Sequence, residues 1–249
     1  NNILMNEGYD SKKTIFVKAE GNYIYDDKNQ KYLDTTIGSG THILGHRNTI
    51  IVETLKKQLD TSMLFTTNNN IAFEVSELIT QCVPSIDKIV FCNTGSEATM
   101  RAARISRAYT KKKKIALFSG AWHGGNELFF YDYDYIKNDK KSYHKSAGVP
   151  DEFKELVIVL PYNDNDTFTM IEEHKNELAM VIIEPSQGSN PRDDMQEFLL
   201  KLRNITLENN IVLCFDEMIT GFRVALGGAQ EYYGIEADIV TYGKTIGAG

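Results

Sequence analysis

The sequence is poor in cysteine and contains no long hydrophobic run. Its three cysteines include no Cys-x-x-Cys pair, and Cys92 and Cys214 lie in or beside apolar runs, so we expect buried free thiols in a reducing compartment. There is no stretch of 18 apolar residues and no signal peptide, which excludes a transmembrane helix and predicts a cytoplasmic protein.

Basic charge is also scarce. The net charge is −7 and the pI is near 5.3, so the composition predicts no basic surface for nucleic acid. The one basic block is the lysine run at residues 111–114, which we interpret as a solvated turn between a helix and a strand. The sequence begins without Met and stops within a Gly-rich turn, so we expect a fragment of a longer protein.

Short apolar runs recur from residue 88 onward, and helical patterns separate most of them. Such runs are typical of strands that are covered on both faces. They are KIVFCN (88–93), KIALFS (114–119), ELVIVLP (155–161), MVIIEP (180–185), IVLCFDE (211–217) and DIVTYGK (238–244). The intervening helices are expected to bury two sets of side chains, Ala98, Ala102, Ile105 and Ala108 in one and Phe198, Leu199, Leu202 and Ile205 in the other. This alternation predicts an α/β fold with a mostly parallel sheet and crossover helices.

The N-terminal part reads differently. Residues 14–34 carry β-rich stretches broken by Gly21 and DDKNQ, which predicts a small antiparallel meander. Helices are expected at about 48–60 and 71–82. The aromatic stretch at 129–145 fits neither the helical nor the strand period, so we expect a loop or an insertion there.

The ends of the predicted strands carry the chemistry, because ligands of such sheets bind beyond the carboxyl ends of the strands. These ends offer an anion site, an aromatic ring with an imidazole, an amide, a carboxylate and an amine. The residues, in order, are Gly95 and Ser96, Trp122 and His123, Gln187, Asp216, and Lys244. Together they fit a planar, phosphorylated, nitrogen-containing cofactor that needs a lysine.

Each element also has a plainer interpretation, and from the residues alone both stay open. Thr94-Gly95-Ser96-Glu97 could be an ordinary helix N-cap, Trp122 a core residue and His123 a structural histidine. Asp216 could be salt-bridged and Lys244 solvated. The functional interpretation gives both residues a chemical role. Asp216 could face a pyridinium nitrogen, and such a carboxylate keeps the ring protonated. Desolvation could lower the pKa of Lys244 and free its amine for Schiff-base chemistry.

Two commoner nucleotide motifs and a metal motif are excluded. Gly38-Ser39-Gly40 would need Gly at position 43 for a dinucleotide fingerprint, and Gly243-Lys244-Thr245 would need Gly at 238 for a P-loop; these positions are Ile43 and Asp238. His42 and His46 lack the Glu of a zinc-protease helix, so we assign them a structural role and predict no metal.

The ordered segments NTGSEATMRAARISRAYT, AWHGG, IIEPSQG, CFDEMITGFR and GGAQEYYGIEADIVTYGKTIGAG resemble the signatures of class III pyridoxal-phosphate-dependent aminotransferases. The resemblance covers residues 14–249. Within the family, TGFRVALGGAQEYYG and SAGVPDEFKE are most similar to glutamate-1-semialdehyde 2,1-aminomutase. The stretch PSQGSNPRDDMQEFLLKLRNIT is similar to aminotransferase modules attached to peptide and polyketide synthases.

The resemblance implies a fold-type-I transferase whose three-layer α-β-α large domain spans residues 48–249, after an N-terminal β segment of the small domain at 1–47. It implies pyridoxal 5'-phosphate as cofactor, a homodimer, and small amine and carbonyl substrates that could be carrier-bound. The resemblance implies that Lys244 forms the Schiff base, that Asp216 pairs with the pyridinium nitrogen, and that Gly95 and Ser96 hold the phosphate. It implies that Trp122 stacks on the ring, with His123 and Gly124 continuing the same motif, and that Met218 covers the other ring face. Gln187 would approach the phenolic oxygen, and Glu184 would support the site from its rim.

Three alternatives differ in what they predict. An aminomutase moves the amino group within one molecule, but it usually carries Tyr-His-Gly-His where this chain has Trp122-His123-Gly124-Gly125. An NAD-dependent dehydrogenase needs the fingerprint that is absent here. A catalytically silent homologue would lack Lys244 or Asp216, and both are present. We therefore expect amino transfer between an amine or amino acid and a carbonyl substrate.

Overall fold

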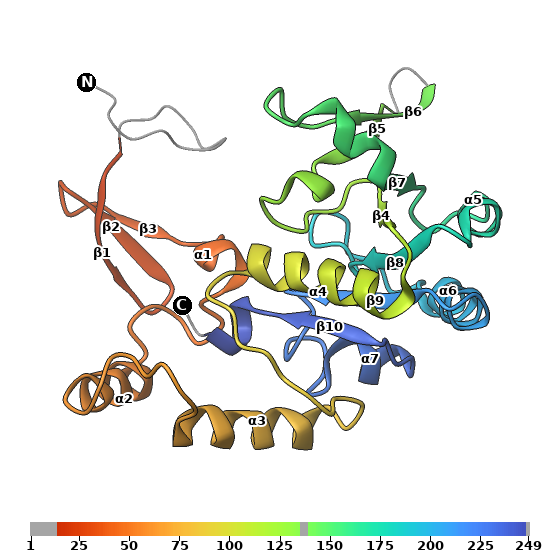
Figure 1. Cartoon of the computed structure of the whole chain (residues 1–249). Coiled ribbons are helices and arrows are strands. Elements are labelled where there is room, and N and C mark those ends of the chain that lie inside the picture. The colour runs from red at the N-terminus through yellow and green to blue at the C-terminus, as the bar shows by residue number, and fades with distance from the viewer. Residues whose placement is uncertain (1–13, 135–138, 248–249) are drawn as a thin grey trace. The chain divides into compact units, whose positions relative to one another are not determined.

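The computed structural model describes residues 14–134 and 139–247 (Figure 1). The chain divides into two compact units, residues 1–66 with 248–249 and residues 67–247, which are described separately. The domain boundary expected between residues 47 and 48 stays a prediction, because compactness alone places the division after Thr66.

The first unit contains the predicted meander. Its strands β1 (Phe16–Glu20), β2 (Tyr23–Asp26) and β3 (Lys31–Leu33) pair antiparallel in sequence order. The Asp26 carboxylate accepts hydrogen bonds from the backbone N–H groups of Lys28 and Gln30 and so shapes the β2–β3 turn. Two helices follow, the short α1 (Ile37–Gly40) and α2 (Thr49–Leu59), and the second confirms the helix expected at 48–60.

His46 has the structural role expected of it. Its Nε2 lies 2.7 Å from Oδ2 of Asp34, and both side chains are largely buried. Asp34 also accepts hydrogen bonds from the hydroxyl and N–H of Thr36 and from Ile37 N. This network ties the end of the meander to the chain that follows α1.

The second unit begins with α3 (Asn70–Cys82), as predicted, and is built on a five-stranded parallel sheet. The strands are β4 (Lys114–Phe118), β7 (Val157–Leu160), β8 (Leu178–Ile183), β9 (Val212–Glu217) and β10 (Ile239–Tyr242), in the spatial order β10-β9-β8-β4-β7. Five of the six predicted strands are therefore confirmed, with the predicted parallel pairing.

Successive side chains of these strands enter two different cores. Ile115, Leu117 and Cys214 face the core that includes α4 (Gly95–Thr110), while Phe118 and Phe215 face the opposite one. The opposite core is covered by α5 (Asp166–His174), α6 (Gln196–Glu208) and α7 (Gly228–Tyr233). Helices thus lie on both sides of the sheet (Figure 1), which confirms the three-layer fold.

One predicted strand is wrong. Residues 88–92 join no ladder with the described residues, and Val90 and Phe91 are 59% and 53% exposed. An apolar run becomes a strand only where a neighbouring strand satisfies its N–H and C=O groups. No described strand does so here.

The segment at 129–145, expected to be a loop or an insertion, is an insertion that forms mostly an antiparallel ribbon. Its strands are β5 (Tyr131–Asp134) and β6 (Asp139–His144). The ribbon is inserted between β4 and β7 and is flanked by the short 3₁₀ helices η1 (Glu127–Phe129) and η2 (Asp151–Leu156). Tyr131 is buried, whereas Asp132 and Tyr133 are only partly buried, so the strand-like alternation that the sequence analysis did not recognise is present at the start of β5.

The face that α4 buries also differs from the prediction. Ala102 is buried as expected, but Ile105 is 50% exposed and Ala108 is exposed. The buried face consists of small and hydroxylated residues, namely Thr99, Ala102, Ala103, Ser106 and Thr110. Small side chains allow a helix to approach the sheet closely, and this requirement outweighs hydrophobicity here. In α6 the predicted face is confirmed.

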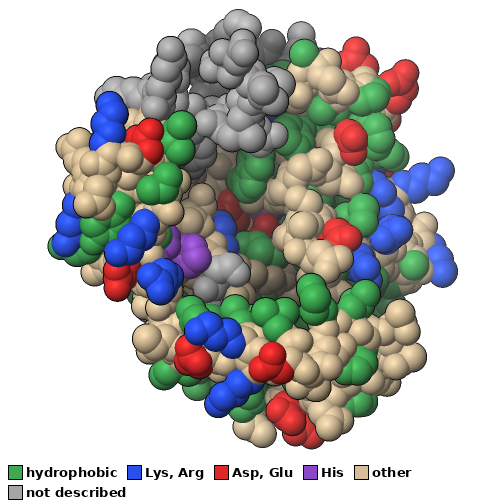
Figure 2. Space-filling model, turned by 90° about the vertical axis from the view of Figure 1, so that its left-hand side faces the viewer, with side chains coloured by type: hydrophobic (Ala, Val, Ile, Leu, Met, Phe, Trp, Pro, Cys, Tyr) green, Lys and Arg blue, Asp and Glu red, His purple; other side chains and the backbone are tan. Residues whose placement is uncertain are grey.

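Charged and cysteine side chains need two further corrections. The lysine run is not simply solvated, because Lys112 donates hydrogen bonds to three backbone carbonyls and Lys114 pairs with Glu177. Cys214 is buried as predicted, but Cys92 is partly exposed. On the face seen in Figure 2, Lys and Arg side chains are interspersed with Asp and Glu. None of the described helices is both long and apolar enough to cross a membrane.

Candidate active site

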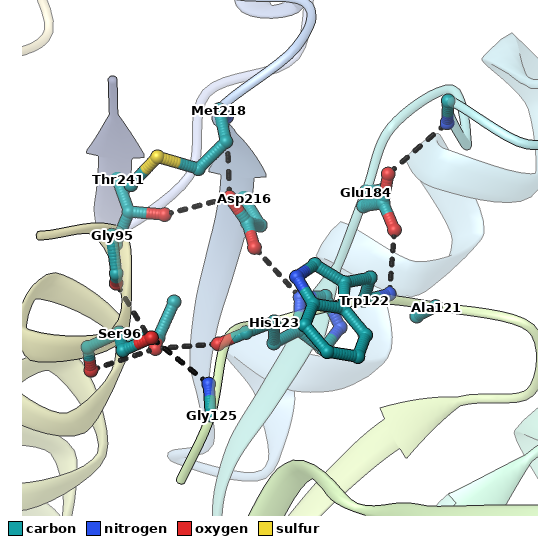
Figure 3. A network of polar contacts seen from close by, with 12 residues as sticks. Gly95, Ser96, Ala121, Trp122, His123, Gly125, Glu184, Asp216, Met218 and Thr241 are labelled. Atoms are coloured by element: carbon teal, nitrogen blue, oxygen red, sulfur yellow. Dashed lines mark hydrogen bonds and ion pairs between the residues drawn. The ribbon is translucent and has the colours of Figure 1, made fainter. Parts of the chain in front are cut away.

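The carboxyl ends of the parallel strands bring Trp122, His123, Glu184 and Asp216 to one edge of the sheet, where Gly95, Ser96 and Met218 join the same network (Figure 3). Asp216 is near the end of β9, directly beside Thr241 of β10 in the parallel register. Glu184 follows β8, and the loop with Trp122 and His123 follows β4. Residues that lie about 120 positions apart in sequence, such as Ser96 and Asp216, therefore belong to one network.

Asp216 is the buried centre of this network. Its Oδ1 accepts hydrogen bonds from the Thr241 hydroxyl at 3.0 Å and from Met218 N at 3.2 Å, and its Oδ2 lies 2.7 Å from Nδ1 of His123. Asp216 is 2% exposed, and within residues 14–134 and 139–247 it pairs with no Lys or Arg. A buried carboxylate held mainly by uncharged donors can accommodate a further cation at favourable energy.

His123 is fixed on one side and unsatisfied on the other. Its ring is fully buried, its backbone carbonyl accepts a hydrogen bond from the Thr99 hydroxyl at 2.7 Å, and its Nδ1 faces Asp216. Its Nε2 is buried and has no partner among the described residues. The imidazole thus sets the orientation of the Asp216 carboxylate.

The N-terminus of α4 presents hydrogen-bond donors of the kind that an anion site needs. The Thr94 hydroxyl accepts a hydrogen bond from Glu97 N at 3.1 Å, so the N-cap interpretation holds, while the N–H groups of Gly95 and Ser96 need an acceptor from outside the helix. The Ser96 hydroxyl oxygen accepts a hydrogen bond from Gly125 N at 2.9 Å and keeps its own proton for donation. Two backbone donors, one hydroxyl and the helix dipole suit a phosphate.

Gly124 is required for this arrangement. Its φ is +91°, and a Cβ at this position would lie 2.5 Å from the Ser96 hydroxyl oxygen and 2.8 Å from Ser96 Cα. Any larger residue would push the chain away from the helix N-terminus. The close approach of the loop backbone to the backbone at Ser96 therefore explains the first glycine of the Trp-His-Gly-Gly motif.

Trp122 is not a core residue. Its side chain is 59% exposed, and its ring packs edge-to-face against Phe130 at 5.6 Å between centroids. The backbone N–H of Trp122 donates to Oε1 of Glu184 at 2.9 Å, and Oε2 of the same carboxylate accepts from Gly188 N at 3.1 Å. Glu184 therefore ties the loops after β4 and β8 together, and an exposed indole at this edge is available to stack on a planar ligand.

Gln187 and Met218 border the same edge. The Gln187 amide is buried and donates to the Ser119 carbonyl at 2.8 Å, which leaves one N–H and its oxygen for another partner. The Met218 sulfur would be 3.1 Å from a Cβ on Gly95 and 2.5 Å from one on Gly243. It therefore packs between the start of α4 and the turn after β10.

Lys244 opens the 3₁₀ turn η3 (Lys244–Gly247) just beyond β10 and is partly buried. Its φ of +45° is unusual for a residue with a side chain. The turn is anchored by Arg223, whose Nη2 donates to the Thr245 hydroxyl at 2.9 Å. The strained conformation and the anchored turn indicate that the position of this lysine is enforced by its surroundings.

Glu217, next to Asp216, serves the fold instead. It is fully buried and accepts hydrogen bonds from the Thr220 hydroxyl at 2.8 Å, from Ala229 N at 2.5 Å and from Gln230 N, at the start of α7. Burial raises the pKa of Glu217, and these hydrogen bonds oppose the rise. The two adjacent carboxylates thus point to opposite faces of the strand and have different roles.

The network includes residues that the sequence did not indicate. Thr99 and Thr241 are the clearest, because each places a hydroxyl on a predicted site residue. Thr241 could have been noticed as a polar residue within an apolar strand. Among the described residues, no three His, Cys, Asp or Glu side chains are close enough to hold a metal ion.

Comparison with known proteins places these features in a family. The family model for class III aminotransferases matches residues 4–249. Glutamate-1-semialdehyde 2,1-aminomutase of Thermodesulfovibrio yellowstonii is 39% identical over 240 residues, which are 94% of this chain and 55% of that protein. The Methanosarcina acetivorans enzyme of the same name is 38% identical over 237 residues, with 93% and 55% coverage. The chain thus spans about half the length of the curated relatives it matches.

Solved structures agree with this result. An omega-transaminase from Sphaerobacter thermophilus is 32% identical with a TM-score of 0.89, covering 97% of this chain and 57% of that one. A beta-phenylalanine aminotransferase from Variovorax paradoxus is 27% identical with a TM-score of 0.81, covering 96% and 52%. With the family model matching almost all of the chain, the protein belongs to the class III aminotransferase family.

Proposed function

We propose that the protein is a pyridoxal-phosphate-dependent aminotransferase, which moves an amino group between an amine or amino acid and a carbonyl substrate. The observation that carries the proposal is the buried Asp216 carboxylate, which is oriented by His123 and Thr241 and lacks a Lys or Arg partner among the described residues. A protonated pyridine nitrogen is the cation that such a carboxylate would stabilise.

The residues of the edge fit this cofactor. Gly95 and Ser96 would hold its phosphate with backbone donors and a hydroxyl. Trp122 and Met218 would cover the faces of its ring, Gln187 would meet its phenolic oxygen, and Glu184 would fix the loop that carries Trp122. His123 would act from behind Asp216 rather than on the ring.

Pyridoxal phosphate, when bound, supplies an aldehyde that condenses with amines and a ring that withdraws electrons from the carbon next to the nitrogen. Lys244 Nζ would hold the cofactor between turnovers. Once substrate has taken its place, the free amine of Lys244 would be the base that moves a proton from the substrate carbon to the cofactor carbon, which is the shift that amino transfer requires. Asp216 would keep the ring nitrogen protonated throughout.

The test is amino transfer by the full-length protein with a panel of amines, amino acids, keto acids and aldehydes. We expect a carbonyl product from the donor and an aminated product from the acceptor in equal amounts, and Lys244→Ala should form neither. A protein that binds the cofactor but transfers nitrogen between no pair in the panel would count against transferase activity.

An aminomutase is the second candidate, and it is favoured by the names of the relatives that are 36–41% identical. A mutase must retain its deaminated intermediate until the second half of the reaction, so closure of its site matters. In the loop after Trp122 the chain departs from the aminomutase motif at Gly125, and this departure favours the transferase.

Single-turnover reactions with the aminated form of the cofactor distinguish the two. A transferase stops after one equivalent of product until a donor is added. Sustained isomerisation of glutamate-1-semialdehyde without any donor would show that the protein is a mutase.

We further propose a cytoplasmic homodimer that acts on small amines and carbonyl compounds, free or carrier-bound, with residues 48–249 as the cofactor-binding domain. The location is supported by the three free cysteines and the dimer by the family resemblance. Light scattering of the full-length protein tests the dimer, and a monomer mass at active concentrations would refute it.

A further inference from the structure

The loop that carries Trp122 is held along most of its length. This strand-end loop, residues 119–125, connects β4 to the segment before η1. Four residues named above hold one backbone group each: Gln187 at Ser119, Glu184 at Trp122, Thr99 at His123 and Ser96 at Gly125. Two residues without a role in the proposed function hold three further groups of the loop. These groups are the Ser119 hydroxyl, the Gly120 N–H and the Ala121 carbonyl.

These two residues are Asp132 and Lys145. Asp132 accepts a hydrogen bond from the Ser119 hydroxyl, and its two oxygens lie 3.3 and 3.2 Å from Gly120 N. Lys145 Nζ donates to the Ala121 carbonyl at 2.9 Å and lies 3.9 Å from Oδ2 of Asp132. The pair thus holds the three residues that directly precede Trp122.

This ion pair differs from an ordinary surface pair. The side chains of Lys145 and Asp132 are only 22% and 14% exposed. Burial lowers the pKa of Lys145, and the nearby carboxylates of Asp132 and Glu184 oppose this shift without cancelling it. Exposed pairs contribute little to stability, but a largely buried pair that also bonds to the backbone fixes the geometry of its partners.

Both residues belong to the ribbon of β5 and β6. Asp132 lies on β5, and Lys145 directly follows β6, where its N–H donates to the Phe130 carbonyl at 2.7 Å. Phe130 is the residue whose ring supports the Trp122 indole. The ribbon itself is anchored by the buried Tyr131 and by the Tyr133 hydroxyl, which donates to the Val159 carbonyl of β7. It therefore supports both the backbone and the ring of Trp122.

We propose that Asp132 and Lys145 are positioning residues that fix the angle at which Trp122 presents its indole to the bound ring. The identity of that ring rests on the proposed function. The positioning of Trp122 does not rest on the proposed function, because it is a property of the loop without any ligand. Neither residue is expected to touch the reacting atoms.

The experiment measures the local motion of Trp122 in the cofactor-free, full-length protein by time-resolved fluorescence anisotropy. The Trp122→Phe protein supplies the background from any other tryptophan. Lys145→Met removes the charge and the hydrogen bond to Ala121. Lys114→Met is the matched control, since Lys114 is also 22% exposed and ion-paired but lies at the opposite end of β4.

We expect Lys145→Met to raise the amplitude of the nanosecond motion of Trp122 about twofold or more, Lys145→Arg to restore it, and Lys114→Met to leave it unchanged. We also expect the dissociation constant for pyridoxal phosphate to rise about tenfold in Lys145→Met, as the loss of one charged hydrogen bond predicts. If Lys145→Met does not fold, Asp132→Asn decides by the same measurement.

Unchanged Trp122 motion in a folded Lys145→Met or, failing that, Asp132→Asn protein would overturn the proposal. Equal effects of Lys145→Met and Lys114→Met would also overturn it, because they would indicate a general loss of stability. A protein in which Trp122 is loosened as expected but pyridoxal phosphate does not bind at all would refute the proposed function and leave the positioning role intact.

Discussion

At the scale of single residues, the environment of each carboxylate decides its role. Asp216 and Glu217 are adjacent and both buried, yet one is surrounded by residues of the candidate site and the other by the N-terminus of α7. Asp238, just before β10, is a third case. It forms two hydrogen bonds with the Arg203 guanidinium, at 2.8 and 3.0 Å, and accepts from Leu213 N.

This contrast predicts the effect of Asp216→Asn. The amide oxygen can still accept the hydrogen bond from Thr241, so the protein should fold and bind cofactor through the phosphate site. Turnover should fall by about 10²-fold or more, because the ring nitrogen is no longer held protonated. The measurement is the turnover number of cofactor-saturated protein.

Asp238→Asn is the matched control for this substitution. It removes a partly exposed carboxylate just before β10 that pairs with Arg203 and accepts from Leu213 N of β9, so it should lower the melting temperature while turnover per folded molecule changes little. Near-wild-type turnover of Asp216→Asn would contradict the proposal that Asp216 pairs with the pyridinium nitrogen.

At the scale of elements, Lys112 joins three segments. Its ammonium donates to the carbonyls of Lys175, Asn209 and Asn210, at 2.7, 2.7 and 3.1 Å, just after the ends of α5 and α6. Burial lowers the pKa of Lys112. These carbonyls lie at the C-terminal ends of helices, where no backbone N–H group of the same helix is available to donate to them.

Lys112→Met should therefore lower the free energy of unfolding by about 1–3 kcal/mol, because it leaves these acceptors without their donor. Lys113→Met, at the exposed neighbouring position, should change it by less than about 0.5 kcal/mol. Urea unfolding of the two variants checks this, and equal midpoints for both would show that the contacts contribute nothing.

The link between Asp34 and His46 predicts a pH dependence for the N-terminal meander. Burial raises the pKa of Asp34, but hydrogen bonds from His46, Thr36 and Ile37 N outweigh this and lower it to about 2. The folded pKa is below the unfolded value of 3.8, so the carboxylate contributes stability above about pH 4. That contribution is lost as the pH falls from about 4 to about 2.

Hydrogen exchange of peptides that cover residues 31–46, corrected for the intrinsic pH dependence of exchange, measures this effect. Protection should decrease between pH 4 and pH 2 in the wild type. In Asp34→Asn it should already be low at pH 5 and change little on acidification. A wild-type profile that is flat over this range would contradict the assignment.

The elements also show what the sequence could predict. The five buried strands were correct because strands covered on both faces appear as apolar runs. Residues 88–92 have the same composition but lack a described partner, and pairing is not a local property. The site residues at strand ends followed from the topology, whereas Asp132 and Lys145 did not. They act through a ribbon whose register no local pattern specifies.

At the scale of the whole molecule, the account depends on one covalent attachment. Lys244 is partly buried, strained in backbone conformation and held by an anchored turn at the end of β10. Lys145 is bound to the strand-end loop, where it is engaged by Ala121 and Asp132. Of these two amines, that of Lys244 should therefore be the one available to an aldehyde bound at the candidate site.

Borohydride reduction of the full-length protein with pyridoxal phosphate, followed by peptide mass spectrometry, tests this directly. We expect a visible absorption band that reduction removes, the reduced cofactor on the peptide that contains Lys244, and neither signal in Lys244→Ala. Cofactor fixed on Lys145 or on any other lysine, with Lys244 unmodified, would contradict the central claim.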